Sequence, residues 1–194
     1  MRILLSVTKL TVNLELNNLD GIAYYTQNLI NEFSKLRLNF QLIALTKRGA
    51  NKIKSKHVYK TSNFFIFFLH KIFSGNKISS KLESSDLLHI TDHIVPFTKN
   101  IPLIANVMDT YSLSHPNMLS GSRILRAIKN WLWIVASRQA DHIITISNFS
   151  KQDIIKYMGI PEEKISVIPL GVDEIYYKKI PKKNIIFQQI ISFL

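Results

Sequence analysis

The 194-residue sequence contains no cysteine, no long hydrophobic run and few acidic side chains. Without cysteine it can form no disulfide, no thiol nucleophile and no zinc–thiolate site, a composition that suits the cytoplasm. No apolar run approaches the ~20 residues that span a bilayer. The apolar start, Met1–Val7, is soon interrupted by Lys9, and no small-residue cleavage site follows. We therefore interpret it as a first core strand rather than a signal peptide.

The scarcity of acidic residues leaves a strong positive charge, because 25 Lys and Arg against 13 Asp and Glu give +12. This excess favours an anionic partner, such as a lipid surface, a phosphorylated substrate or nucleic acid. The alternative is that the charge serves only solubility. Nucleic acid is the weakest candidate, because the sequence holds no recognition motif and its aromatic residues cluster in apolar helices instead of alternating with basic ones.

Short apolar and β-branched runs alternate with segments of helical periodicity. In Gly21–Leu36, for example, apolar residues recur at three- and four-residue steps. Strands are expected at residues 2–7, 40–45, 86–90, 102–107, 142–146 and 165–168, with a short one near 57–59, and further helices at 63–73, 122–139 and 148–158. The polar segment Thr8–Asp20 is expected to be a loop. The alternation predicts an α/β fold with a Rossmann-like, doubly wound parallel sheet.

The most informative stretch runs from Ala140 to Asp173 and reads ADHIITISNFSKQDIIKYMGIPEEKISVIPLGVD. It combines a strand, a helix that starts near Ser147 and ends at Gly159, and a second strand. It resembles the closing segment of the N-terminal domain in retaining glycosyltransferases of the GT-B fold, family four. There the pattern aD.iitvS.fs..di....gi...ki.vipnGvd leads to the hinge before a second domain. The likeness extends, more thinly, back to residue 1.

This resemblance implies that residues 1–175 are the acceptor-side domain, and that residues 176–194 are a linker and the start of an absent donor-binding domain. The complete enzyme would move a hexose such as mannose from a nucleotide-sugar to a glycan or lipid-linked acceptor, with no cofactor and no metal. We expect the chain alone to be inactive, because the second domain normally holds the donor. The alternative is a non-catalytic remnant or a basic module that binds membrane surfaces.

Three residues are candidates for donor binding. Gly21 opens the first long helix after the first strand, and helix N-termini attract phosphate. In the resembled family two glycines here let the backbone approach the donor phosphate; Asp20 replaces the first of them and is expected to cap the helix. Met108 stands where the family typically has a histidine close to the donor sugar, and a thioether can neither donate a hydrogen bond nor transfer a proton. Ser147 is the third candidate, and its residue pattern indicates a helix start.

Asp109 is the candidate catalytic residue, because it ends a strand at the expected ligand edge and could orient the acceptor. A structural role as a turn aspartate is an equal alternative. His89, Asp92 and His93 look like a metal cluster, but their spacing matches no known closed ligand set, so no metal site is expected.

The helix expected at residues 122–139 has two unlike sides at 100° per residue. The apolar side, expected to face the core, holds Ile124, Leu125, Ile128, Trp131, Leu132, Val135 and Ala136. The other side carries Arg123, Arg126 and Lys129, with Trp133 among them. Tryptophan beside basic residues on an exposed face is typical of a membrane interface. This side is therefore predicted to hold a cytoplasmic protein peripherally on the inner membrane face; alternatively, a loop or the second domain covers Trp133.

Overall fold

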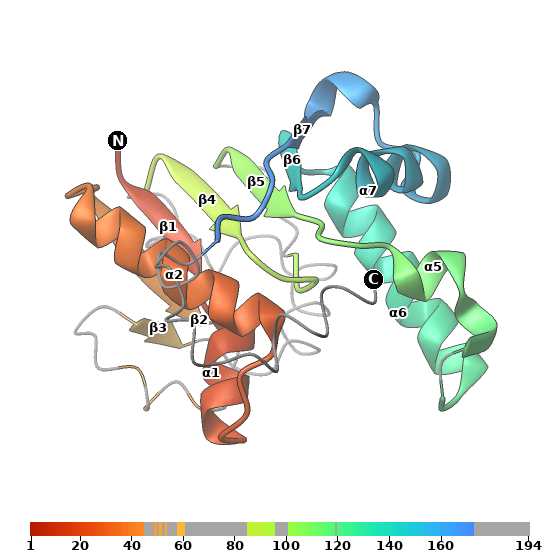
Figure 1. The fold of residues 1–194 in the computed structure, drawn as a ribbon, viewed down its shortest axis with the longest axis horizontal. Coiled ribbons are helices and arrows are strands. Elements are labelled where there is room, and N and C mark those ends of the chain that lie inside the picture. The colour runs from red at the N-terminus through yellow and green to blue at the C-terminus, as the bar shows by residue number, and fades with distance from the viewer. Residues whose placement is uncertain are drawn as a thin grey trace, which may run out of the picture.

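The computed structural model describes residues 1–44, 49, 51, 53, 58–60, 85–95, 101–118 and 120–172. Within these ranges, seven strands form one sheet in the order β3-β2-β1-β4-β5-β6-β7, and every neighbouring pair is parallel. Figure 1 shows the sheet flanked by helices. The predicted Rossmann-like α/β fold is confirmed.

The strands are β1 (Ile3–Ser6), β2 (Phe40–Ala44), β3 (Val58–Lys60), β4 (Leu87–Ile90), β5 (Leu103–Asn106), β6 (His142–Thr145) and β7 (Ile165–Val167). The helices are α1 (Thr8–Glu15), α2 (Gly21–Lys35), α5 (Tyr111–Ser114), α6 (Arg123–Arg138) and α7 (Asn148–Asp153), which continues into a wider helical turn, η3 (Ile154–Met158). Two single turns, η2 (Pro116–Met118) and η4 (Glu162–Lys164), complete the described elements.

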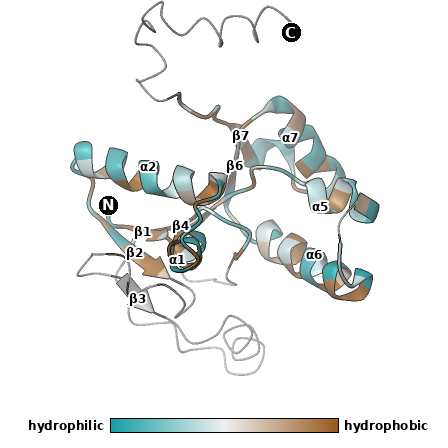
Figure 2. Ribbon diagram, turned by 60° about the horizontal axis from the view of Figure 1, so that its bottom comes forward, coloured by the Kyte–Doolittle hydropathy of each residue, from teal (hydrophilic) through white to brown (hydrophobic). Residues whose placement is uncertain are grey.

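The core has two parts because side chains of a strand point alternately to opposite faces of the sheet. Leu5 of β1 packs in a cluster with Ala23 of α2. Its neighbour Leu4 belongs to the other cluster, which includes Trp133 and Ala136 of α6. Figure 2 accordingly shows α2 on one side of the sheet and α6 on the other.

Helix ends agree with the local signals in the sequence. Asp20 accepts a hydrogen bond from the Ala23 N–H at 2.9 Å and caps α2. Ser147 accepts one from the Ser150 N–H at 3.1 Å and caps α7. Gly159 ends η3 with φ of 60°, the left-handed conformation that favours glycine. These three predictions from residue type are confirmed.

The expected loop at Thr8–Asp20 is wrong over its first half, which forms helix α1. Leu10 is buried and Leu14, one turn later, packs against the same cluster. The start of this helix depends on a distant residue, because the Lys9 N–H donates to Asp92 Oδ2 at 3.0 Å. A local pattern cannot show such a contact.

Two expectations lie outside the described residues: the apolar helix at 63–73, and the linker with the start of a second domain at 176–194. Among the residues that the structure describes, none of the helices has both the length and the apolar character to cross a membrane.

Candidate active site

The carboxyl ends of β1 and β4 meet at the point where the strand order reverses. From β1 the chain proceeds to β2 and β3 on one side, whereas β4 to β7 extend on the other. Ligands of open parallel sheets bind in the crevice at such a switch point. Lys9 follows β1 at this edge, Asp92 and His93 follow β4, and Asp109 follows β5.

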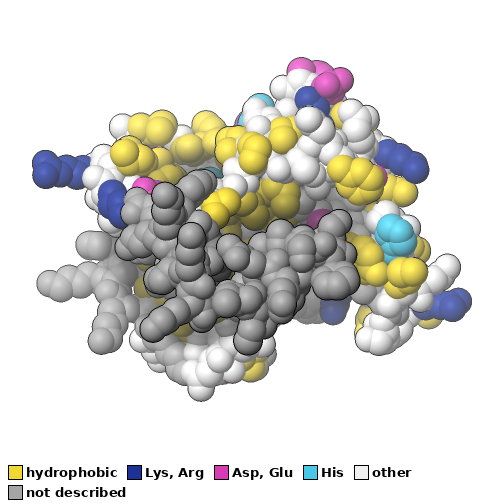
Figure 3. Space-filling model, in the orientation of Figure 1, with side chains coloured by type: hydrophobic (Ala, Val, Ile, Leu, Met, Phe, Trp, Pro, Cys, Tyr) yellow, Lys and Arg dark blue, Asp and Glu magenta, His cyan; other side chains and the backbone are white. Residues whose placement is uncertain are grey.

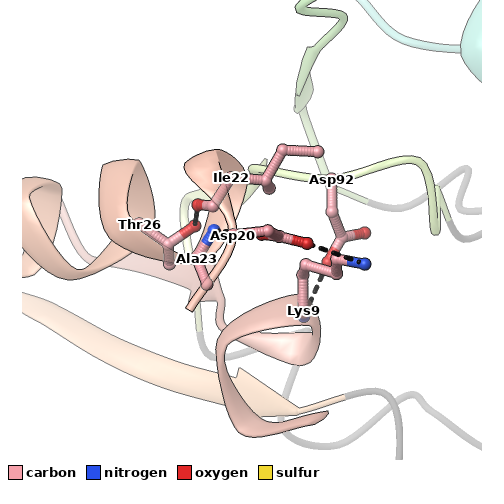
Figure 4. A network of polar contacts seen from close by, with 6 residues as sticks. All are labelled: Lys9, Asp20, Ile22, Ala23, Thr26 and Asp92. Carbon is pink, nitrogen blue, oxygen red and sulfur yellow. Dashed lines mark hydrogen bonds and ion pairs between the residues drawn. The ribbon is translucent and has the colours of Figure 1, made fainter. Parts of the chain in front are cut away.

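Three charged side chains form a compact network at the switch point, shown in Figure 4. The Lys9 ammonium lies 3.0 Å from Asp20 Oδ2. Asp92 accepts from two backbone N–H groups, that of Lys9 at 3.0 Å and that of Ile94 at 2.7 Å. The carboxylates of Asp20 and Asp92 therefore occupy the first turns of α2 and α1, where backbone N–H groups lack helical partners.

The two carboxyl groups respond differently to this setting. Burial raises the pKa of Asp92 to about 6, although the N–H groups of Ile94 and Lys9 and the Lys9 cation oppose it. Burial also raises the pKa of Asp20, but the Ala23 N–H, the side chain of Asn13 and the Lys9 cation outweigh it and bring the pKa below its ordinary value. Asp92 thus titrates in the mildly acidic range, while Asp20 stays ionised.

Gly21 is the first residue of α2 and lies exposed beside the Lys9–Asp20 ion pair. A Cβ built on Gly21 meets no atom within 4 Å. Packing therefore does not require glycine at this position, and the open space beside the backbone leaves room for a ligand.

The edge after β5 is tied to α7 by hydrogen bonds. The Ser150 hydroxyl donates to the Met108 carbonyl at 3.0 Å. Asp109 is exposed, and its Oδ1 accepts from the Tyr111 N–H at 2.9 Å, which starts α5. The structural role considered for Asp109 is present, and its exposed carboxylate remains accessible. The Ser147 hydroxyl donates a hydrogen bond to the Ser150 hydroxyl at 3.0 Å.

His93 brings an imidazole to the same edge. Its ring makes an edge-to-face contact with Trp133, with centroids 4.6 Å apart and planes at 66°. His93 is exposed to solvent, yet the surrounding protein lowers the pKa of its imidazole by desolvation, against the opposing effect of the Asp109 carboxylate. The sequence had suggested His93 only as a metal ligand; the structure places it near Asp109 instead.

A buried hydrogen-bonded chain, missed from the sequence, crosses three elements below this edge. His89 Nε2 and Asn106 Oδ1 lie 2.9 Å apart, and Asn106 Nδ2 donates to the Tyr25 hydroxyl at 2.9 Å. Because the amide oxygen only accepts, the neutral imidazole carries its proton on Nε2. Burial lowers the pKa of His89, which keeps it uncharged. The sequence feature that could have indicated this chain is the single polar residue in each of two apolar strands, LLHI and LIAN.

A family model described as Glycosyltransferase Family 4 matches residues 19–175, which is most of the chain. The chain belongs to glycosyltransferase family 4. No curated protein matches it. The family match begins after β1 and α1, although β1 lies inside the sheet between β2 and β4 and lines the switch point.

Membership in this glycosyltransferase family implies a sugar donor and a sugar acceptor as partners. In the described part of the chain, no three His, Asp or Glu side chains are grouped so that they could hold a metal ion. Met108, at the position where the resembled pattern has histidine, is half-buried and offers a thioether. An imidazole is nevertheless present at this edge, because His93 follows the neighbouring strand β4.

The prediction that Trp133 lies on an exposed membrane face of α6 is wrong. Arg123 and Lys129 are exposed and Arg126 is half-buried, but Trp133 is only 8% exposed and packs on His93. The side of α6 expected in the core instead faces outward along its first half, with Ile124, Leu125, Ile128 and Trp131 all exposed. Each side of the helix carries one tryptophan, so the sequence pattern could not tell which of the two sides faces the sheet.

Proposed function

We propose that this glycosyltransferase family 4 chain is the acceptor-side half of a retaining GT-B enzyme. The enzyme transfers a hexose, mannose-like in kind, from a nucleotide-sugar to a glycan or lipid-linked acceptor. Residues 1–175 form the Rossmann-like half, and residues 176–194 are a linker and the start of the donor-binding half. The observation that carries this proposal is the family match over residues 19–175, on a sheet whose switch point carries the open backbone of Gly21.

Gly21 and Asp109 have different roles in this proposal. The N–H groups at the start of α2 face the donor phosphate, where the missing Cβ of Gly21 permits close approach. The Lys9 cation, 3.0 Å from Asp20, offsets the negative charge that this carboxylate adds there. Asp109 orients the reacting sugars with its exposed carboxylate, and Met108 and Ser147 line the donor side. No cofactor and no metal take part.

The chain alone is expected to transfer no sugar, because one half of a cleft provides few of the contacts that hold a donor. The direct experiment incubates the purified chain with uridine and guanosine diphosphate hexoses and measures turnover. Turnover that Asp109→Ala abolishes and Asp86→Ala retains would contradict the expected inactivity. Asp86 is a suitable control because it is an exposed carboxylate at the opposite edge of the sheet, where it pairs with the chain's N-terminus at 3.8 Å.

Weak donor binding provides a positive test of the proposed site. Nuclear magnetic resonance titration with the same nucleotide-sugars should shift the amide signals near Gly21 and Asp109 at millimolar concentration. The signal of Gly159, which caps η3 elsewhere in the fold, should not move. Shifts spread over the whole surface, or micromolar affinity for this half alone, would count against the proposal.

The second candidate function is a non-catalytic module that binds the membrane surface. Met108 favours it, because a thioether takes the place of the histidine expected beside the donor sugar. In either case we propose a cytoplasmic protein held peripherally on the inner membrane face, with an anionic lipid surface as partner and the +12 charge as its electrostatic support.

A further inference from the structure

The first half of α6 exposes an apolar surface that the rest of the described protein does not cover. The exposed fractions are 73% for Ile124, 60% for Leu125, 50% for Ile128 and 61% for Trp131. At 100° per residue, Ile124, Ile128 and Trp131 fall within about 60° of one another. We call these four residues the α6 apolar face. Figure 3 shows hydrophobic side chains at the margin of the molecule over α5 and α6.

The packing of α6 explains why this face is directed outward. The helix buries the opposite side. Trp133 and Ala136 pack in the core cluster with strand residues, Trp133 also contacts His93 after β4, and Ser137 is buried. The middle of the helix is held in place from α5, since the Asn130 amide donates to the Ser112 carbonyl at 2.9 Å. Turning the apolar face inward would break both sets of contacts. The face therefore serves something other than the described core.

The charge around the face selects the kind of partner. From Asp109 to Asp141 the intervening sequence contains no acidic residue, whereas Arg123, Arg126, Lys129 and Arg138 are all basic. Arg123 and Lys129 are exposed and lie about 100° around the helix from Ile124 and Ile128, one on each flank of the face. An apolar stripe with basic flanks matches the interface of an anionic bilayer. A second copy of this chain fits poorly, because it would bring the same positive charges together.

We propose that the α6 apolar face inserts into the interface of an anionic membrane, with Arg123 and Lys129 at the level of the lipid headgroups. The sequence predicted attachment through the basic side of the helix, with Trp133 as its aromatic residue. Here the opposite, apolar side inserts, with Trp131 in place of the buried Trp133. The N-terminal end of α6 lies toward the carboxyl edge of the sheet, since a helix that joins two parallel strands runs back against them. Insertion therefore brings the edge with Asp109 close to the bilayer surface.

This orientation also implies a membrane-borne acceptor, an inference that rests on the proposed sugar transfer. Tryptophan fluorescence with lipid vesicles measures membrane insertion alone. Insertion can therefore fail while the proposed sugar transfer stands, and a chain that inserts can still take no part in sugar transfer.

The two tryptophans allow a direct test, because the sequence contains no others. Trp133→Phe leaves Trp131 as the only indole, and Trp131→Phe leaves Trp133. We expect vesicles with one third phosphatidylglycerol to shift the Trp131 emission to the blue, and brominated acyl chains to quench it. The emission of buried Trp133 should change little. Where Trp133→Phe fails to fold, the difference between the parent chain and Trp131→Phe gives the same information.

Binding to these vesicles should depend on named side chains. The double variant Ile124→Ser, Ile128→Ser should weaken partitioning at least about tenfold, and Arg123→Glu with Lys129→Glu about fivefold or more at low salt. Leu36→Ser with Leu38→Ser, two exposed leucines after α2, should leave partitioning unchanged. Quenching of Trp133 but not Trp131 would overturn the proposal. A blue Trp131 emission without vesicles would also overturn it. If the emission then depends on protein concentration, a second copy covers the face; if it does not, other segments of the chain cover it.

Discussion

Helices α2 and α6 have nearly the same length, 15 and 16 residues, and both are amphipathic, yet they present opposite surfaces to solvent. Helix α2 packs Leu29, Ile30 and Phe33 against the core. Its outer side is mostly polar, with Gln27, Asn28, Asn31, Glu32, Ser34 and Lys35 exposed. Helix α6 exposes the α6 apolar face and buries a side that contains Trp133. The sequence assigned both core sides by the same periodicity, correctly for α2 and wrongly for the first half of α6.

The difference shows what a periodic pattern contains and what it omits. Periodicity establishes that a helix has an apolar and a polar side, because residues at three- and four-residue steps share a side. It does not establish whether the apolar side faces the protein's own core or another apolar phase. In α2 the apolar side is the side that faces the core. In α6 it is not, because Trp133 on the basic side is buried and Trp131 on the apolar side is exposed.

The largest effect that would sharpen this comparison comes from truncating the two tryptophans. Trp133→Ala should lower the free energy of unfolding by about 3–5 kcal/mol, because it removes a nearly buried ring and leaves a cavity beside His93. Trp131→Ala should change it by less than about 0.5 kcal/mol, because the ring is mostly exposed. Denaturation in guanidinium chloride measures both. A greater loss for Trp131→Ala would mean that α6 is turned the other way.

The sheet was predictable because its signals are local. The β-branched runs and the caps Asp20, Ser147 and Gly159 each lie within a few residues of the element that they specify. The unpredicted features depend on distant contacts. Helix α1 starts where Asp92, 83 residues away, accepts from the Lys9 N–H.

The candidate site shows the same division between local and distant signals. Strand ends correctly indicated Asp109 as a residue of the carboxyl edge, because parallel strands all end there. The sequence could not show that His93 contacts Trp133 and lies near Asp109, since the three residues come from separate segments. Nor could it connect His89, Asn106 and Tyr25, which belong to β4, β5 and α2.

The second prediction concerns the starts of the two helices, which differ in charge. Helix α2 starts in the network of Lys9, Asp20 and Asp92, whereas the start of α6 carries Ser122 as its cap and no carboxylate. Burial raises the pKa of folded Asp92 from 3.8 to about 6, so the folded state binds this proton more tightly than the unfolded chain does. Stability is therefore highest below pH 3.8 as far as Asp92 is concerned, and falls between pH 3.8 and 6, by about 3 kcal/mol.

Chemical denaturation at several pH values compares the parent chain with Asp92→Asn. The variant loses one of two acceptor contacts and should be less stable at low pH, but the fall that belongs to Asp92 should be absent from its profile. Asp86→Asn is the matched control, because it makes the same substitution at an exposed carboxylate on the opposite edge of the sheet. If the free energies of unfolding of the parent and Asp92→Asn changed with pH in parallel, ionisation of Asp92 would not destabilise the folded state.

The smallest stability effect should come from the glycines at the two helix starts. Substituting them distinguishes a glycine that the backbone conformation requires from one that leaves space for a ligand. Gly121, two residues before α6, has φ of 95°, so Gly121→Ala should cost about 1–2 kcal/mol in strain. Gly21 has no positive φ and an added Cβ meets nothing within 4 Å, so Gly21→Ala should be neutral or stabilise by up to about 1 kcal/mol. If Gly21 serves the donor phosphate, this harmless methyl group should nevertheless diminish the amide shifts that nucleotide-sugars cause at the start of α2. Unchanged shifts in a folded Gly21→Ala chain would remove Gly21 from the proposed donor site, because no loss of structure could account for the result.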